Sequence, residues 1–321
     1  MREPIPTPEH RVPDAAPGNW VDRCAPPAAR PYLRLSRADR PIGTWLLLIP
    51  CWWGLALAIL HTTEPRIADL WIGIGCAIGA WLMRGAGCTW NDITDRDLDR
   101  QVSRTASRPI VSNQVSVQQA LFWMVAQAAA AFLILLTFNK VAIVLGILSL
   151  FPVLIYPFAK RFTWWPQVFL GIAFNWGILL AWTAHAGELH FAALVLYASG
   201  ICWTLFYDTI YAHQDANDDE LIGIKSTARL FGNRSSIWLR RFVLATVALM
   251  IFSILLALLP ADRWEFLALP LLGVLAMGTH LIWQLHRFDS HDITGLLHLF
   301  RSNRDAGLIL VVFFCFAIFF R

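Results

Sequence analysis

Side chains that could hold a metal ion and a polyphosphate follow an apolar run that ends near residue 89. Asn91, Asp95 and Asp99 recur every four residues. On a helix with about 3.6 residues per turn, this spacing places the three side chains in one stripe. The same periodicity turns Asp92 and Asp97 elsewhere. The stripe is expected to present amide and carboxylate oxygens at the edge of a hydrophobic segment.

A second group of acids follows another apolar run, which ends near residue 211. Asp215 and Asp219 are again four residues apart, and Asp218 and Glu220 lie beside them. We call residues 91–99 the first acidic cluster and residues 215–220 the second. Each is followed by cations, which are Arg100, Arg104 and Arg108 after the first and Lys225 and Arg229 after the second.

Two carboxylate clusters at one membrane surface would repel each other unless a positive group lay between them. Mg²⁺ takes oxygen ligands and is usually bound by one or two carboxylates together with substrate phosphates, whereas zinc prefers histidine and cysteine. The Asn and Asp residues therefore favour magnesium. The alternative is a solvated loop whose acids pair with neighbouring arginines.

The composition indicates a polytopic membrane protein. Hydrophobic residues make up 57% of the 321-residue chain and charged residues only 15%, and the mean hydropathy is +0.53. A soluble domain of this length would carry far more charge. The six cysteines are dispersed without a CxxC pair, so neither a zinc site nor a disulfide framework is expected.

Nine hydrophobic segments are long enough, or nearly so, for the roughly 20 residues that a bilayer core of about 30 Å requires. They cover residues 42–60, 68–89, 118–138, 140–158, 165–185, 190–211, 241–259, 264–286 and 306–320. The division at Asn139 and Lys140 is the least distinct. Nine spans put 21 of the 26 Lys and Arg residues on one side, which the positive-inside rule identifies as cytoplasmic. Both acidic clusters lie on that side.

Residues 1–31 contain eight prolines and no apolar periodicity, so we expect a disordered tail ahead of a membrane domain at 32–321. Four acidic residues argue against a transit peptide, and no apolar run precedes residue 42, which argues against a cleaved signal. From residue 32 to 43, leucines alternate with arginines, as in an interfacial segment.

A third cytoplasmic turn, at residues 156–167, carries Tyr156, Lys160 and Arg161. These side chains could supply a hydroxyl and two cations to the site of the acidic clusters. The alternative is a positive-inside anchor with an aromatic belt, which Trp164 and Trp165 resemble.

These motifs resemble the UbiA superfamily of intramembrane prenyltransferases. The segment NDITDRDLD at 91–99 is similar to its NDxxDxxxD motif, and DANDD at 215–219 is similar to its second motif, DxxxD. RTASRP, YPFAKR and the run from YDTIYAHQ to STARLFG resemble the 4-hydroxybenzoate polyprenyltransferase branch. The resemblance covers about residues 33–320 and implies an all-α bundle of about nine transmembrane helices around a central active-site cavity.

The resemblance also implies roles for individual residues. The residues expected to hold Mg²⁺ and the diphosphate are Asn91, Asp92, Asp95, Asp99, Asp215 and Asp219. The residues expected to bind the leaving group or the acceptor are Asn91, Arg104, Tyr156, Lys160, Arg161 and Lys225. The expected catalytic residues are Asp95, Asp99, Asp215, Asp219 and Arg161.

The implied reaction is transfer of a polyprenyl group from polyprenyl diphosphate to the carbon ortho to the hydroxyl of 4-hydroxybenzoate, in ubiquinone biosynthesis. The expected cofactor is Mg²⁺, and the expected location is the lipid bilayer of a bacterial inner membrane, with no nucleic-acid partner. Haem, menaquinone and chlorophyll-type prenyltransferases share the first motif and are alternatives. A phosphatidyltransferase would need a DG…AR…G…D…D pattern, which is absent from the sequence. An ion-coupled transporter would place acids near the bilayer midplane rather than at span ends.

Overall fold

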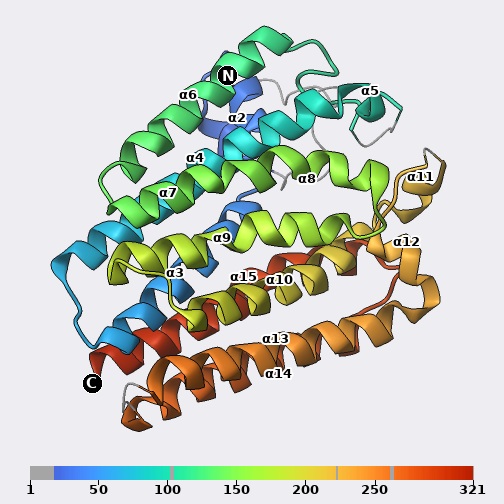
Figure 1. The fold of residues 1–321 in the computed structure, drawn as a ribbon. Helices are drawn as coiled ribbons and strands as arrows, with labels where there is room; N and C mark the ends of the chain where they lie inside the picture. Colours follow the sequence, from blue (N-terminus) through green and yellow to red (C-terminus); the bar gives the residue numbers. More distant parts are fainter. Residues whose placement is uncertain (1–17, 102–104, 222, 261–263, 321) are drawn as a thin grey trace. The chain divides into compact units, whose positions relative to one another are not determined.

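The computed structural model describes residues 18–101, 105–221, 223–260 and 264–320. Every regular element in these ranges is a helix, as Figure 1 shows. Nine helical stretches among them are long and apolar enough to cross a membrane. The predicted all-α membrane fold with nine spans is confirmed, while the central cavity stays a prediction.

The chain forms two compact units, each made of two stretches of sequence. Unit 1 comprises Met1–Thr44 and Gly79–Leu133, and unit 2 comprises Trp45–Ile78 and Ile134–Arg321. Three long helices contribute to both units. They are α3 (Ile42–Thr62), α4 (Ile67–Thr94) and, through its last two residues, α6 (Val117–Leu135). The first acidic cluster belongs to unit 1 and the second to unit 2.

Unit 1 begins with two short helices, α1 (Trp20–Cys24) and α2 (Arg30–Leu35). Asn19 caps α1, and the side chain of Val21 is fully buried beside Ala25 and Ala38. Our expectation of disorder is therefore wrong for residues 18–31, because the apolar side chains of α1 have a packing partner. Residues 1–17 of the expected tail lie outside the described residues.

The remaining elements of unit 1 surround a small core. They are α5 (Arg96–Asp99) and most of α6 (Val117–Leu135). Leu35 at the end of α2 packs with Ile110, Val115 and Ala120. The hydroxyl of Ser36 donates to Oε1 of Gln127 over 2.9 Å, so the end of α2 is fixed against α6 by both apolar and polar contacts.

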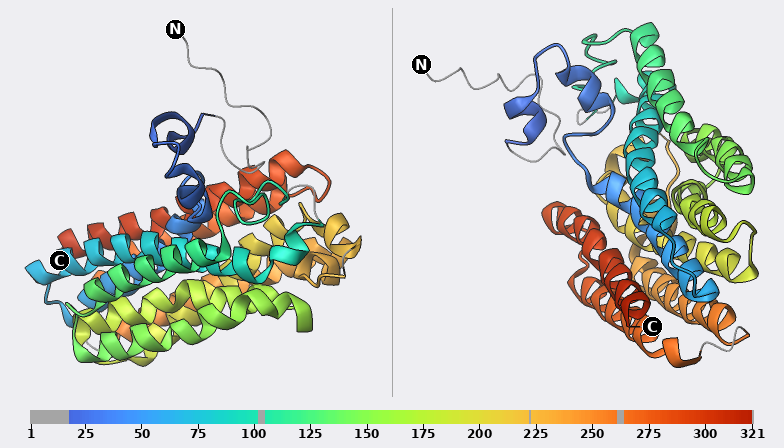
Figure 2. Two further views of the ribbon diagram at one scale, coloured as in Figure 1. Left: turned by 90° about the horizontal axis from the view of Figure 1, so that it is seen from above. Right: turned by 90° about the vertical axis from the view of Figure 1, so that its left-hand side faces the viewer.

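Unit 2 contains the other helices. They are α7 (Lys140–Leu148), α8 (Leu150–Phe162), α9 (Pro166–Ala186), α10 (Phe191–Ala212), α11 (Ala216–Leu221), α12 (Thr227–Phe231), α13 (Ser235–Leu258), α14 (Ala268–Arg287) and α15 (Ile293–Phe319), with 3₁₀ turns at Gly232–Arg234 and Trp264–Phe266. Helix α10 packs against α9, α13 and α15, and α14 lies along α13 and α15, as Figure 2 also shows.

The predicted division at Asn139 is confirmed. Its side chain accepts a hydrogen bond from the Ala142 N–H and so caps α7, which is the usual role of asparagine at a helix start. The same span is broken once more at Ser149, between α7 and α8. Pro152 explains this break, since it has no N–H to donate to Leu148 and its ring crowds that carbonyl.

The last span is longer than we expected from its apolar run, which begins only at residue 306. Helix α15 starts at Ile293, where the carboxylate of Asp292 accepts from the Gly295 N–H. The polar residues that we assigned to a loop are turns of this helix. Asn303 is fully buried. Its Nδ2–H donates to Oε1 of Gln284 over 3.0 Å, and its Oδ1 accepts from the Trp203 Nε1–H over 3.0 Å.

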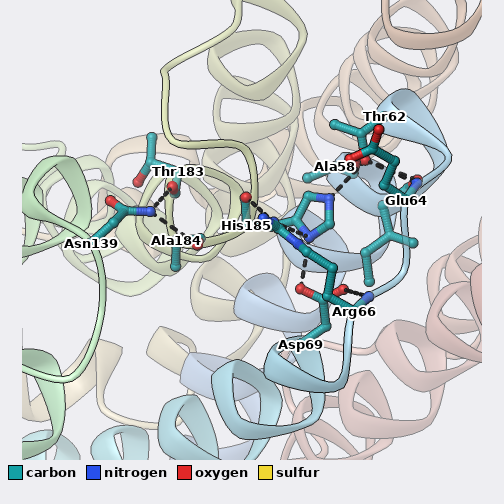
Figure 3. A network of polar contacts seen from close by, with 10 residues as sticks. Ala58, Thr62, Glu64, Arg66, Asp69, Asn139, Thr183, Ala184 and His185 are labelled. Carbon is teal, nitrogen blue, oxygen red and sulfur yellow. Dashed lines mark hydrogen bonds and ion pairs between the residues drawn. The ribbon is translucent and has the colours of Figure 1, made fainter.

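A polar network around the buried side chains of His185 and Asp69 joins helix ends of unit 2, as Figure 3 shows. Nδ1 of His185, at the end of α9, lies 2.7 Å from Asp69 Oδ1, and its Nε2 lies 2.7 Å from the hydroxyl of Thr62. Arg66 also contacts the His185 ring and carbonyl. Asp69 accepts from the Arg66 N–H over 2.7 Å. This network fixes the connection between α3 and α4 against the end of α9.

We expect Asp69→Asn to lower the thermal unfolding midpoint of the detergent-solubilised protein, because it removes the carboxylate that pairs with the buried His185 ring. Breaking a buried ion pair from one side typically costs about 3–5 kcal/mol. Glu64→Gln is the matched control, since Glu64 is exposed on the same connection. Equal midpoints for both variants would show that the network contributes nothing to stability.

Candidate active site

The backbone keeps the predicted spacing of the first acidic cluster, although the helix is interrupted. Helix α4 ends at Thr94, Asp95 has φ −98° and ψ 2°, and α5 begins at Arg96. The Asp95 N–H nevertheless donates to the Asn91 carbonyl over 2.9 Å, and the Asp99 N–H to the Asp95 carbonyl over 2.8 Å. Asn91, Asp95 and Asp99 therefore stand one helical turn apart, as predicted.

Three carboxylates of this cluster are buried. Asp95 is 0% exposed, Asp92 1% and Asp99 6%. Only Asp97 reaches solvent, with 75% of its side chain exposed. Burying a carboxylate costs free energy unless a cation or hydrogen bonds compensate its charge. These three acids therefore require positive groups close to them.

Two arginines provide that charge. Arg108 Nη1 lies 2.6 Å from Asp99 Oδ2 and 3.2 Å from Asp92 Oδ1. Arg37 Nη2 lies 2.6 Å from the same Asp92 oxygen. Our expectation that Asp92 points away from the other acids is therefore wrong, because Arg108 bridges Asp92 and Asp99. These acids are seven residues apart, which is two helical turns.

The charges around Asp99 act in opposite directions. Burial raises the pKa of Asp99 above its ordinary value, Arg108 opposes that rise, and the charges of Asp92 and Asp95 add to it. The Thr105 hydroxyl donates to the Asp99 carbonyl over 2.8 Å and holds the following turn in place. A further positive charge at this cluster would favour ionised Asp99.

One carboxylate oxygen in the first acidic cluster lacks a hydrogen-bond partner among the described residues. Within the part of the chain that the structure describes, Asp92 Oδ2 is buried and has no hydrogen-bond partner. The neighbouring side chains of Asn91, Asp95 and Asp99 carry amide and carboxylate oxygens. A hard divalent cation such as Mg²⁺ prefers oxygen ligands of this kind. No cluster of three or more His, Cys, Asp or Glu side chains close enough to hold a metal ion occurs among the described residues. The fit to magnesium therefore rests on the donor types and on the unpartnered Asp92 Oδ2.

The second acidic cluster lies where α10 gives way to α11. Helix α10 ends at Ala212, Asp215 precedes α11, and Asp219 lies within that helix. The side chains of residues 217–219 lie outside the described part, as does Arg104 after the first cluster. His213 stands at the end of α10, and its Nε2 lies 2.9 Å from the Ser235 hydroxyl. Burial, together with the charge of His291, lowers the pKa of His213 to about 4, so this ring is neutral at pH 7.

The cationic turn of residues 156–167 meets the segment after the second cluster. The Lys225 N–H donates to the Lys160 carbonyl over 3.2 Å, and Lys225 Nζ donates to the Phe162 carbonyl over 3.4 Å. The Gln167 amide oxygen accepts from the Thr227 N–H over 3.2 Å. The backbones of Lys160 and Lys225 are thus in contact, although the two residues are far apart in the sequence.

Other predicted site residues lie on or near the same turn. Tyr156 is one helical turn before Lys160 on α8. Arg161 is exposed, and its guanidinium lies 5.1 Å from the centre of the Phe158 ring. The ring of Trp164 lies 6.0 Å from Lys225 Nζ and 5.5 Å from the Arg229 guanidinium. Trp164 is therefore a cation–π partner of these two side chains. The sequence pattern indicates Trp164 only as part of an aromatic belt at the membrane surface.

Two features of the site were not identified from the sequence. Arg37 lies in a segment that we interpreted only as interfacial, and Arg108 was noted as a nearby cation without its bridging contact. The signal for Arg108 was its position nine residues after Asp99. No local pattern indicates the contact of Arg37 with Asp92, since the two residues are 55 positions apart.

Comparison with known proteins gives consistent matches over most of the chain. The model of the UbiA prenyltransferase family matches residues 47–303. A protein from Rattus norvegicus named "4-hydroxybenzoate polyprenyltransferase, mitochondrial" is 46% identical over 90% of this chain and 75% of its own length. A protein of the same name from Aedes aegypti is 45% identical over 87% of this chain, and this chain spans only 62% of it.

A solved structure shares the fold. The UbiA homologue from Archaeoglobus fulgidus, described as bound to DMAPP and Mg²⁺, has a TM-score of 0.68 and 18% identity, covering 89% of this chain and 98% of its own. Both relatives are named mitochondrial, so our expectation of a bacterial inner membrane is not supported. The family match over four fifths of the sequence excludes the transporter alternative. The chain belongs to the UbiA prenyltransferase family.

Proposed function

We propose that this protein transfers a polyprenyl group from polyprenyl diphosphate to the ring carbon ortho to the hydroxyl of 4-hydroxybenzoate, the prenylation of ubiquinone biosynthesis. The names of the relatives from Rattus norvegicus and Aedes aegypti support this substrate pair. The observation in the protein itself that supports it most is the row of three buried carboxylates, Asp92, Asp95 and Asp99, with one buried oxygen that lacks a partner.

The reaction breaks the allylic C–O bond, and its electron pair leaves with the diphosphate. The ring carbon beside the phenol oxygen then forms a bond to the prenyl carbon, and that ring carbon loses its proton. The main demand on the protein is to stabilise the negative charge that collects on the leaving group. Exclusion of water protects the cation-like prenyl carbon from hydrolysis.

Magnesium, when bound, would neutralise the departing diphosphate as a Lewis acid. The residues that would hold it are Asn91, Asp92, Asp95, Asp99, Asp215 and Asp219. The Archaeoglobus fulgidus homologue, whose description names Mg²⁺, supports this assignment. A joint role for the two acidic clusters follows from their shared four-residue spacing and is part of the proposal.

Lysine and arginine side chains would bind the negative charges of the diphosphate and of the acceptor carboxylate that magnesium does not neutralise. Lys160 and Lys225, whose backbones are joined by a hydrogen bond, are suited to the diphosphate, together with Arg104 and the hydroxyl of Tyr156. Arg161 is suited to the carboxylate of the acceptor, because a planar guanidinium can donate two parallel hydrogen bonds to a carboxylate. We place both clusters and this turn on the membrane side where Lys and Arg are concentrated.

The proposal is tested by incubating membranes that contain the protein with Mg²⁺, a polyprenyl diphosphate and a panel of aromatic acids. We expect prenylated 4-hydroxybenzoate as the main product. Asp95→Asn should reduce the rate by about a hundredfold, the usual effect of removing one group that stabilises developing charge. Asp97→Asn is the matched control from the same motif, because Asp97 faces solvent and should leave the rate little changed.

Two results would count against this function. Prenylation of a different aromatic acid, with 4-hydroxybenzoate left untouched, would favour the menaquinone, haem or chlorophyll type of enzyme. Equal losses in Asp95→Asn and Asp97→Asn would mean that burial in the first cluster does not distinguish the residues that carry the chemistry.

The role of Arg161 is tested separately. Arg161→Lys keeps the charge and loses the two-pronged geometry, so it should raise the KM for 4-hydroxybenzoate more than the KM for the prenyl donor. The expected loss is about 1–3 kcal/mol, the range for a charged hydrogen bond left unmade. Arg234→Lys, an exposed arginine on another loop of unit 2, serves as the control. A larger rise in the KM of the prenyl donor would assign Arg161 to the diphosphate.

A further inference from the structure

Arg37 reaches the first acidic cluster from outside the family-matched region. It follows α2 and lies ten residues before position 47, where the family match begins. Its guanidinium donates to Asp92 Oδ1 over 2.6 Å and to the Arg34 carbonyl over 3.3 Å. Only 9% of the Arg37 side chain is exposed. This arginine is therefore committed to a single buried acid and to its own segment.

The backbone at Arg37 is in an unfavourable conformation. Its φ is +56°, in the left-handed region, where a residue with a Cβ costs roughly 1–2 kcal/mol more than in the right-handed region. Glycine would adopt this conformation without that cost. The hydrogen-bonded ion pair between the Arg37 guanidinium and Asp92 is a stabilising contact that can offset this backbone cost.

The contact decides which oxygen of Asp92 remains available. Both Arg37 and Arg108 approach Oδ1, while Oδ2 is buried without a partner among the described residues. Arg108 divides its contact between Asp92 and Asp99. The shorter contact, from Arg37, fixes the rotation of the Asp92 carboxylate.

We propose that Arg37 is a positioning residue of the active site, which holds Oδ1 of Asp92 so that Oδ2 is left for a divalent cation. The inference rests on the proposed function only in treating Asp92 as a metal ligand. Groups that orient metal ligands in this way typically change metal affinity by about 10- to 100-fold when they are replaced.

Orientation and charge predict opposite results when Arg37 is replaced, which makes the inference testable. If Arg37 acted only as a positive charge, Arg37→Gln would strengthen cation binding, because it removes repulsion, and Arg37→Lys would leave it unchanged. If Arg37 orients Asp92, both substitutions weaken cation binding.

The experiment measures Mn²⁺ binding to the purified full-length protein in detergent, without substrates, from the electron paramagnetic resonance signal of free Mn²⁺. We expect Arg37→Lys to raise the dissociation constant by about tenfold. Arg34→Lys is the matched control. Arg34 lies in the same segment and also pairs with an aspartate, Asp22, at 2.9 Å, so its replacement should leave Mn²⁺ binding unchanged.

A double substitution separates positioning from a general effect on folding. If Arg37 acts through Asp92, Arg37→Gln combined with Asp92→Asn should bind Mn²⁺ no more weakly than Asp92→Asn alone. The pair also removes both charges together, so it remains informative if Arg37→Gln alone unfolds. Additive losses, or unchanged binding in Arg37→Lys, would overturn the inference.

The outcome is independent of the identity of the substrates. Weaker Mn²⁺ binding in the Arg37 variants of a protein that prenylates no aromatic acid would support the positioning role and reject the proposed function. Normal Mn²⁺ binding in Arg37→Lys, together with prenylation of 4-hydroxybenzoate by the native chain, would reject only the positioning role. Absence of Mn²⁺ binding to the native chain would reject both the metal site and the role of Arg37.

Discussion

The cost of burying carboxylates governs the first acidic cluster. Asp92, Asp95 and Asp99 are almost fully removed from solvent, and ions in that position must be compensated by opposite charge or hydrogen bonds. Arg37 pairs with Asp92, and Arg108 pairs with both Asp92 and Asp99. Among the described residues, Asp92 Oδ2 has no hydrogen-bond partner, and this oxygen is the one to which we propose that a divalent cation binds. The same buried negative charge thus requires the two arginines in the fold and would attract a metal ion in the proposed reaction.

Unit 2 meets the same constraint at both ends of its bundle. At one end, His185, Asp69 and Arg66 satisfy one another, and at the other, backbone carbonyls of α8 receive the cationic segment around Lys225. The 21 residues of α9 separate these ends by about 30 Å at 1.5 Å per residue. One end is a network around the buried His185–Asp69 pair, while the other presents the cations Lys225 and Arg229 on the ring of Trp164.

The number of spans was predictable because membrane thickness imposes a length on each apolar run. The helical stripe was predictable too, since backbone spacing survives the interruption at Asp95. Contacts between distant segments were not predictable. Arg37 reaches Asp92 across 55 positions, and α15 extends back to Ile293 because Asp292 caps it and Asn303 finds partners on other helices. Composition alone made residues 18–31 look unable to fold, although Val21 has a core to enter. In each case the missing information was a tertiary partner.

We propose that the carboxylate clusters bind a diphosphate only through a divalent cation. Calorimetric titration of inorganic diphosphate into the purified protein, with and without Mg²⁺, tests this most directly, because it needs neither the prenyl chain nor the aromatic acceptor. We predict saturable binding with Mg²⁺ and none after chelation, since the five carboxylates of Asp92, Asp95, Asp99, Asp215 and Asp219 would otherwise repel the anion. Equally tight binding without Mg²⁺ would contradict it and would assign diphosphate recognition to the lysines and arginines alone.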